Sequence, residues 1–202
     1  MYRLAVDIDG VCADTVPLIL DKLNKHYGKS YTTDDLYEYP LTTFYGNDAM
    51  EVYDLYAEEI YTVAQPVNGA VKVLNMMARE GMDITYLTCR DYRYKDITVN
   101  WLIRNNFPVP QRVICTNDKT AFLRKAKCDF NIDDNPIFTE ELASLNIATA
   151  VLFDCPYNRY LVDPRIIRVS DWYDIWSLIQ TIREDYYAWS TTPNKFGGLR
   201  WR

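Results

Sequence analysis

Two aspartates separated by one residue follow an apolar run near the start of the chain, in Val6-Asp7-Ile8-Asp9-Gly10. Residues 3–8 are apolar enough for a strand buried on both faces, so both carboxylates project from a strand end into a turn. Two carboxylates about 4 to 6 Å apart repel by a few kcal/mol at an effective dielectric near 20. We therefore expect a metal ion or a shared proton beside Asp7 and Asp9. A turn rich in Asp and Gly without any ligand is the structural alternative.

A second acidic pair, Asp133-Asp134, follows the apolar run 130–132 and precedes Asn135-Pro136. In a parallel sheet the carboxyl ends of neighbouring strands lie at one edge, so the two pairs can converge. Three or four carboxylates form a hard oxygen site suited to Mg²⁺, which takes one or two of them together with substrate phosphate and water. An EF-hand is disfavoured, because its series of further oxygen ligands and its closing glutamate are missing.

Two further features could bind an anion. Thr88 ends the run 84–87 and is followed by Cys89-Arg90 and then a predicted helix, so a hydroxyl and backbone N–H groups are available for a phosphate oxygen. Lys119 lies in the loop after residues 112–115, where its ammonium could neutralise a nucleophile and phosphoryl oxygens. Taken singly, Thr88 is also an ordinary strand residue and Lys119 an ordinary surface residue.

The elements that must position these residues alternate between strands and helices. We expect strands at 3–8, 84–87, 112–115, 130–132 and 148–153, and helices at 67–80, 96–106 and 172–182. This alternation predicts an α/β fold, a Rossmann-like doubly wound parallel sheet. Residues 12–64 contain no convincing strand, and two helical segments flank a Tyr-rich acidic loop. We interpret them as a small helical cap inserted after the first strand, with a catalytic core of 1–11 and 65–187 and an irregular tail at 188–202.

Composition limits the classes of function. The chain has 202 residues, 49% of them hydrophobic, enough for one core, and its formal net charge of -6 argues against binding long nucleic acids. No apolar stretch reaches the roughly 18 residues of a membrane helix. Five cysteines without paired spacings indicate reduced thiols and a cytoplasmic location. The single histidine, His26, cannot supply a His-based metal cluster and leaves no Ser-His-Asp triad.

The four chemical features, in this order, resemble the four motifs of the haloacid dehalogenase superfamily from Val6 to about Pro136. Within that superfamily the sequence is most similar to the 5'(3')-deoxyribonucleotidases, through residues 7–14, 65–70, 118–120 and 132–136 and the late segment 151–172. It departs from the animal enzymes after Thr88, where Cys89-Arg90-Asp91 stands in place of a small hydroxyl residue and proline. The Thr-x-Arg form also resembles phosphatase domains of polynucleotide kinases.

The resemblance implies a role for each residue. Asp7 attacks the phosphorus to form an aspartyl-phosphate, and Asp9 protonates the leaving oxygen and later activates water. Mg²⁺ is held by the Asp7 carboxylate and the Asp9 backbone carbonyl, with Asp134 as a direct ligand and Asp133 supporting it. The phosphoryl oxygens are bound at three positions: Thr88, Cys89 and Lys119.

Four aromatic residues of the cap offer flat surfaces for a nucleobase, namely Tyr37, Tyr39, Phe44 and Tyr45. Of these, Phe44 and Tyr45 are the chosen substrate-binding candidates. Stacking of a base on an aromatic ring contributes roughly 1 to 3 kcal/mol. The alternative is that these rings form the core between the cap helices. Arg90 is expected to bind a second anionic group of the substrate or to join a surface network beside Asp91.

These residues together predict a Mg²⁺-dependent phosphatase of nucleoside monophosphates, with deoxyribonucleotides preferred. A phosphatase acting on 3'-phosphate ends of nucleic acids is the alternative enzyme, and the acidity of the chain counts against it. A non-catalytic binding protein on the same fold is the alternative from another class. The expected partner is a small nucleotide, with no long nucleic acid and no membrane, and the sequence leaves a homodimer open.

Overall fold

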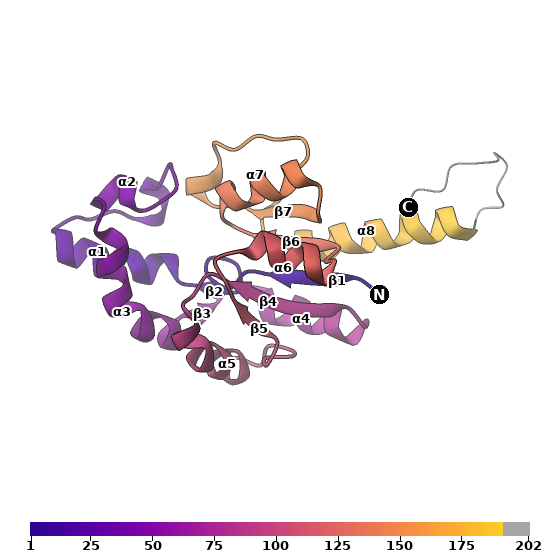
Figure 1. The fold of residues 1–202 in the computed structure, drawn as a ribbon, viewed down its shortest axis with the longest axis horizontal. Coiled ribbons are helices and arrows are strands. Elements are labelled where there is room, and N and C mark those ends of the chain that lie inside the picture. The colour runs from indigo at the N-terminus through magenta and orange to yellow at the C-terminus, as the bar shows by residue number, and fades with distance from the viewer. Residues whose placement is uncertain (192–202) are drawn as a thin grey trace.

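The computed structural model describes residues 1–191, and the side chains of residues 1–184. Its centre is a sheet of six parallel strands in the order β5-β4-β1-β6-β7-β8 (Figure 1). The strands are β1 (Arg3–Val6), β4 (Asp83–Thr88), β5 (Val113–Cys115), β6 (Phe130–Asp133), β7 (Thr149–Phe153) and β8 (Ile167–Val169). The predicted parallel doubly wound sheet is thus confirmed. The strand that the sequence did not reveal is β8, whose three residues carry an exposed Arg168 at their centre.

Helices cover both faces of the sheet. Side chains alternate between the two faces along each strand, so each face has its own set of apolar residues to bury. Leu4 and Val6 of β1 belong to the larger core cluster, whereas Ala5 between them belongs to a second cluster on the opposite face. The first face is covered by α4 (Ala70–Arg79), α5 (Lys95–Arg104) and α8 (Trp172–Thr191), and the second by α6 (Lys119–Ala126) and α7 (Pro136–Leu145).

The starts of α6 and α7 are fixed by side-chain caps, which bear on the site. The Asp118 carboxylate accepts a hydrogen bond from the Ala121 amide at the start of α6. The Asn135 side chain accepts bonds from two amides at the start of α7, and Pro136 occupies its first turn. Both are favourable N-cap arrangements. They hold Lys119 and the end of β6 at the same edge of the sheet.

A helical segment leaves the core after β1 and returns before α4. Its two ends pair as short antiparallel strands, β2 (Ala13–Asp14) and β3 (Gln65–Pro66). Between them lie α1 (Val16–Tyr27), the 3₁₀ turn η1 (Thr33–Asp35), α2 (Thr42–Tyr45) and α3 (Ala49–Val63), at the left of Figure 1. Apolar residues of α1, α2 and α3 form a separate buried cluster. The expectation of no strand in residues 12–64 was wrong, because β2 is too short to leave a periodic pattern.

Two buried tryptophans anchor the loops that lead into and out of this segment. The Trp172 indole N–H donates to the carbonyl of Val11 at 2.9 Å, and the Trp101 indole N–H donates to the carbonyl of Ala64 at 2.8 Å. Both rings are fully buried in the core. The loop after β1 and the end of α3 are therefore tied to helices far away in the sequence.

The last helix is longer than expected. It continues to Thr191, so residues 188–191 are helical where the sequence indicated irregular chain. The breakers on which that expectation rested, Pro193, Gly197 and Gly198, all lie beyond it, and residues 192–202 of the expected tail are outside the described part. No helix within residues 1–191 is both long and apolar enough to cross a membrane.

Candidate active site

The candidate site lies where the winding of the sheet reverses. Counting only the strands of the large sheet, their spatial order is 3-2-1-4-5-6, so β1 and β6 lie side by side and the chain winds outward from them in both directions. Open α/β sheets bind ligands at this switch point, beyond the carboxyl ends of the strands. Asp7 follows β1 directly, and Asp133 is the last residue of β6.

The turn after β1 is closed by backbone hydrogen bonds. The Asp7 amide donates to the carbonyl of Ile132 at 2.9 Å, which continues the pairing with β6. The carbonyl of Ile8 accepts from the amides of Val11, Cys12 and Ala13. Such a tight turn requires the positive φ of +76° that Gly10 adopts. Asp7 and Asp9 are thereby held on a rigid loop.

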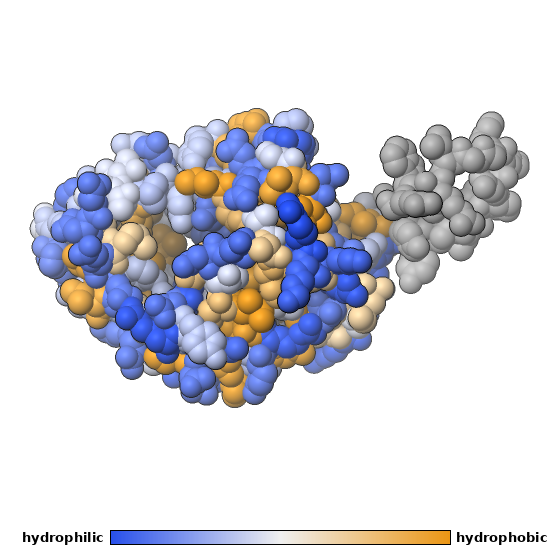
Figure 2. All heavy atoms as spheres, in the orientation of Figure 1, coloured by the Kyte–Doolittle hydropathy of each residue, from blue (hydrophilic) through white to orange (hydrophobic). Residues whose placement is uncertain are grey.

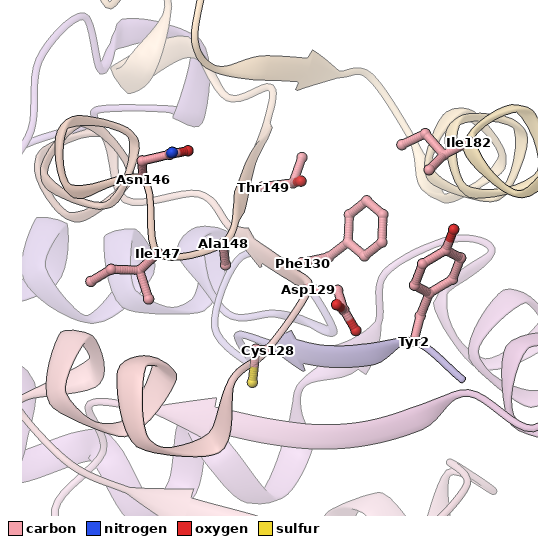
Figure 3. A pocket seen from close by; sticks show the side chains of 9 residues that line it. All are labelled: Tyr2, Cys128, Asp129, Phe130, Asn146, Ile147, Ala148, Thr149 and Ile182. Carbon is pink, nitrogen blue, oxygen red and sulfur yellow. The ribbon is translucent and has the colours of Figure 1, made fainter. Parts of the chain in front are cut away.

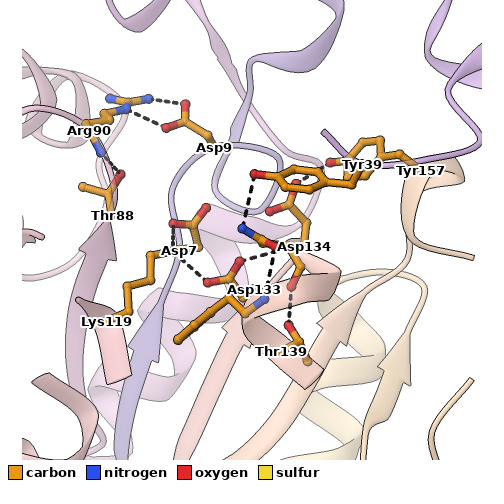
Figure 4. A network of polar contacts seen from close by, with 12 residues as sticks. Asp7, Asp9, Tyr39, Thr88, Arg90, Lys119, Asp133, Asp134, Thr139 and Tyr157 are labelled. Atoms are coloured by element: carbon orange, nitrogen blue, oxygen red, sulfur yellow. Dashed lines mark hydrogen bonds and ion pairs between the residues drawn. The ribbon is translucent and has the colours of Figure 1, made fainter. Parts of the chain in front are cut away.

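Lys119 joins the carboxylates of the two strand ends. Its ammonium lies 2.6 Å from Asp7 Oδ1 and 2.8 Å from Asp133 Oδ2, and all three side chains are buried (Figure 4). Burial alone would lower the pKa of Lys119, but the carboxylates of Asp133 and then Asp7 outweigh it and raise that pKa well above its usual value. Lys119 is therefore a fixed positive charge.

Asp134 is held from the opposite side. The Tyr157 hydroxyl donates to its Oδ2, and the Asn158 side-chain amide donates to its backbone carbonyl at 2.9 Å. Burial, and then the charge of Asp133, raise the pKa of Asp134 to about 7. Burial also raises the pKa of Asp7 well above its usual value, reinforced by the neighbouring carboxylates and opposed by Lys119. Asp7 is buried and Asp134 is partly buried, so the two carboxylates lie close together with little contact with water.

A divalent cation fits this set of donors. Asp7, Asp133 and Asp134 each offer a carboxylate oxygen, and these oxygens lie within 4.8 Å of one another. Asp133 has both oxygens engaged, one by Lys119 and one by the Asn135 amide, whereas Asp7 and Asp134 each keep an oxygen that accepts no bond from a described residue. A hard, oxygen-lined site of this kind suits Mg²⁺.

Asp9 points away from this cluster toward Arg90. The guanidinium donates from Nε to Asp9 Oδ2 at 2.9 Å and from Nη2 to Oδ1 at 2.8 Å. Arg90 was expected to bind the substrate or to lie on the surface, but its side chain is only 1% exposed and is occupied by Asp9. No sequence pattern indicated this pairing, since 81 residues separate the two.

Thr88 and Cys89 lie at the end of β4, which neighbours β1. Thr88 is buried, and its hydroxyl oxygen accepts from the Arg90 amide at 3.2 Å. Cys89 is an exposed residue beside it, but its thiol is partly shielded from water by neighbouring atoms, and this shielding, more than the charges around it, raises the pKa of the thiol. The structure therefore brings the predicted phosphate-binding residues to the same edge as Asp7 and Lys119.

The two chosen cap aromatics are not brought there. Phe44 and Tyr45 are buried inside the cluster of α1, α2 and α3, where Tyr31 packs edge-on against both rings. The Tyr45 hydroxyl donates to Asn24 at 2.7 Å. The expectation that these two rings face a nucleobase is corrected here. The helices of this small segment pack their large rings against one another to form a core.

Two tyrosines reach the site instead: Tyr39, one of the four cap aromatics considered from the sequence, and Tyr157, which the sequence did not single out. Tyr39, from the loop before α2, accepts a hydrogen bond from the Asn135 side chain at 3.2 Å, and its ring lies 6.2 Å from that of Tyr157. Burial, and then the charge of Asp134, raise the pKa of Tyr39, so its hydroxyl stays protonated. With 17 tyrosines in the chain, no spacing signal distinguishes Tyr157.

A separate cavity lies elsewhere. A cavity of about 350 Å³ is lined by residues at the opposite, amino-terminal edge of the sheet, among them Tyr2, Asp129 and Thr149 (Figure 3). It contains none of the residues described above, so it is separate from the candidate site.

The fold and the site together define the class. A haloacid dehalogenase-like hydrolase from Streptococcus pneumoniae has the same fold, with a TM-score of 0.63 at 13% identity, covering 89% of this chain and 99% of that one. The aspartates that follow β1 and end β6 stand at the carboxyl edge of this fold, with Lys119 between them. The fold is therefore that of the haloacid dehalogenase-like hydrolases.

The family is more specific. The chain belongs to the family described as 5' nucleotidase, deoxy (pyrimidine), cytosolic type C, whose model matches residues 1–185. It is 27% identical over 174 residues to the "Putative nucleotidase BH1399" of Halalkalibacterium halodurans, covering 84% of this chain and 88% of that protein. It is 23% identical over 190 residues to the "Putative 5'(3')-deoxyribonucleotidase" of Chlorobaculum tepidum, covering 88% and 89%. The protein is thus a nucleotidase.

Gly10 offers a test of the site's geometry. A Cβ at Gly10 would clash with the Asp134 carboxylate, with the carboxyl carbon at 2.9 Å, whereas a Cβ at Gly28 would meet nothing within 4 Å. Both glycines have positive φ, so Ala costs each about 1 to 2 kcal/mol of backbone strain. We expect Gly10→Ala to lower phosphatase activity by about 10- to 100-fold through displacement of Asp134, and Gly28→Ala to lower stability alone. Phosphate release and urea unfolding of both variants provide the measurement, and equal activities would contradict the assignment.

Proposed function

We propose that this nucleotidase is a Mg²⁺-dependent phosphomonoesterase that acts on deoxyribonucleoside monophosphates through an aspartyl-phosphate on Asp7. One observation carries the proposal. Among the described side chains, the carboxylates of Asp7, Asp9, Asp133 and Asp134 are matched by only two cations, Lys119 and Arg90. Full ionisation leaves an excess of two negative charges at the place where a phosphate dianion must bind. A divalent cation offsets that excess.

Asp7 and Asp134 would hold the ion through their free oxygens, with the backbone carbonyl of Asp9 as a further ligand. Asp133 would act indirectly, since it is bound to Lys119. When bound, Mg²⁺ supplies charge neutralisation for the carboxylates and for the phosphoryl oxygens. This division of roles agrees with the hydrogen bonds of the two neighbouring aspartates.

The chain's own residues account for the chemistry. A carboxylate oxygen of Asp7 forms a bond to phosphorus while the bond from phosphorus to the nucleoside oxygen breaks. Asp9 gives its proton to the departing oxygen and then takes one from the water that attacks the phosphorylated Asp7. Lys119, Thr88 and the backbone beside Cys89 hold the phosphoryl oxygens. Inorganic phosphate leaves, and the carboxylate of Asp7 is regenerated.

Residues 12–64 would act as a cap over this edge. The paired ends β2 and β3 give the segment a stem, and its own buried cluster makes it a unit. Tyr39 places an aromatic ring of the cap beside Asn135 and is our candidate for contact with the nucleoside. The deoxyribonucleotide preference is supported by the family description and by the name of the Chlorobaculum relative.

The surroundings of the site also favour a small substrate. In Figure 2 the outer surface of the segment at the left is mostly hydrophilic. The exposed acidic residues of the cap include Asp34 and Glu38, whose charge would repel a polynucleotide. All five cysteines are free, which supports a cytoplasmic location.

Asp7→Asn should abolish turnover while the protein stays folded, because the amide keeps the shape of the side chain but is neither a nucleophile nor an anionic ligand. We expect a loss of about 10³-fold or more in kcat for phosphate release from a nucleotide. Asp83→Asn, at the amino-terminal end of β4, is the matched control and should keep its activity. Turnover by Asp7→Asn within about tenfold of the wild type would remove Asp7 from its role.

Metal removal should be equally decisive. We expect excess chelator to stop hydrolysis and added Mg²⁺ to restore it, because the carboxylates repel a phosphate dianion without a cation. Mg²⁺ should also raise the midpoint of thermal unfolding of the wild type, and less so for Asp134→Asn, since a ligand that binds the folded state stabilises it. Full activity in chelator would overturn the proposed site.

Substrate size separates the nucleotidase from an end-processing phosphatase. We expect a higher kcat/KM for a deoxyribonucleoside monophosphate than for a 3'-phosphorylated oligonucleotide, because a cap encloses small substrates and a polymer needs a basic groove. Steady-state phosphate release from both substrates at two salt concentrations is the measurement. Preference for the oligonucleotide, lost at high salt, would favour end processing.

A further inference from the structure

Arg90 is a buried arginine whose contacts all belong to the protein. Besides its two hydrogen bonds to Asp9, Nη1 donates to the Thr98 hydroxyl of α5 at 3.0 Å. The guanidinium carbon lies 3.7 Å from the centre of the Tyr61 ring on α3. Tyr61 is itself fixed, because its hydroxyl lies 2.6 Å from the hydroxyl of Tyr53. The cation is therefore held from three elements, namely the turn after β1, α5 and α3.

The ion pair between Arg90 and Asp9 is more deeply buried than the neighbouring pair between Arg93 and Asp54. Arg93, three residues further on, pairs with Asp54 of α3, but both of those side chains are about half exposed to water. Exposed pairs of that kind restrain little. Arg90 engages both oxygens of Asp9 from a side chain that is 1% exposed, and a two-pronged bond of this kind fixes the plane of the carboxylate as well as its position.

A direct role in binding substrate does not fit this geometry. One side of the guanidinium faces Asp9, another faces Thr98, and its flat face lies on Tyr61. With its side chain 1% exposed, there is no open approach for an anionic group of a nucleotide. Asp9 is the partner that remains accessible, since its side chain is 28% exposed. Any effect of Arg90 on the reaction must then pass through Asp9.

We propose that Arg90 is a positioning residue that holds the acid–base carboxylate of Asp9 in line with the leaving oxygen, and that α3 of the cap holds Arg90 through Tyr61. The proposal rests on the proposed function, in which Asp9 transfers the proton. It assigns a purpose to the departure Cys89-Arg90 in the motif after β4. It also makes the geometry of Asp9 depend on the cap segment.

The test compares a substrate that needs a proton with one that does not. A deoxyribonucleoside monophosphate releases a poorly acidic alcohol, whereas 4-nitrophenyl phosphate releases a stable phenolate. We expect Arg90→Gln to lower kcat on the nucleotide by about 10- to 100-fold, within the range that acid–base help provides. On 4-nitrophenyl phosphate the loss should be within about threefold, and KM for the nucleotide should change little.

Arg90→Lys keeps the positive charge and the long stem but cannot make the two-pronged bond, so it should show the same selectivity. It also serves if Arg90→Gln does not fold, as judged by thermal unfolding. Arg93→Gln removes an arginine from the same loop and is the matched control, for which both substrates should react as with the wild type. Guanidinium ion added to Arg90→Ala should restore part of the turnover of the nucleotide.

A double-mutant cycle completes the experiment. If Arg90 acts only through Asp9, Arg90→Gln should cost nothing further in an Asp9→Asn background. Equal losses on both substrates, a raised KM for the nucleotide, or a full additional loss in that background would overturn the proposal. The proposed function is judged separately, by the activity of the wild type and the leaving-group dependence of Asp9→Asn, so the two can fail independently.

Discussion

Electrostatic repulsion among carboxylates at the switch point of the sheet is the main physical cost of the candidate site, and the contacts around the site hold those carboxylates in place. Asp7, Asp133 and Asp134 place oxygens within 4.8 Å of one another in a buried setting, and their cost is visible in the raised pKa of Asp7 and Asp134. A structure bears such a cost only when its surroundings hold the groups in place. Lys119 offsets part of the charge, and the negative charge that remains makes a divalent cation the expected occupant.

Hydrogen bonds of the backbone and of neighbouring side chains hold the carboxylates in place against this repulsion. The turn after β1 is closed by three hydrogen bonds to a single carbonyl, that of Ile8, and by the backbone that only a glycine at position 10 adopts readily. On the other side, Tyr157 and Asn158 fix Asp134 through its side chain and its carbonyl. A site built on strand ends and capped helix starts needs little reorganisation when a substrate arrives.

The cap segment and the core meet at charged and aromatic contacts beside the site. Arg90 connects the turn after β1 to α3, and Tyr157 lies both against Asp134 and in the apolar cluster of the cap. Movement of this segment would therefore shift the positions of both Asp9 and Asp134. This arrangement links residues 12–64 directly to the candidate site.

The sequence alone predicted the fold class and a set of residues that meet at one edge of the sheet, namely Asp7, Asp9, Thr88, Lys119 and the Asp133-Asp134 pair. It could do so because strand periodicity and the position of a polar residue at a strand end are local properties. Only the tertiary structure decided the pairing of Arg90 with Asp9, the burial of Phe44 and Tyr45, the approach of Tyr39 and Tyr157, and the existence of β2 and β8. These are contacts between distant segments or elements of two or three residues, and they arise from packing that leaves no periodic trace along the chain.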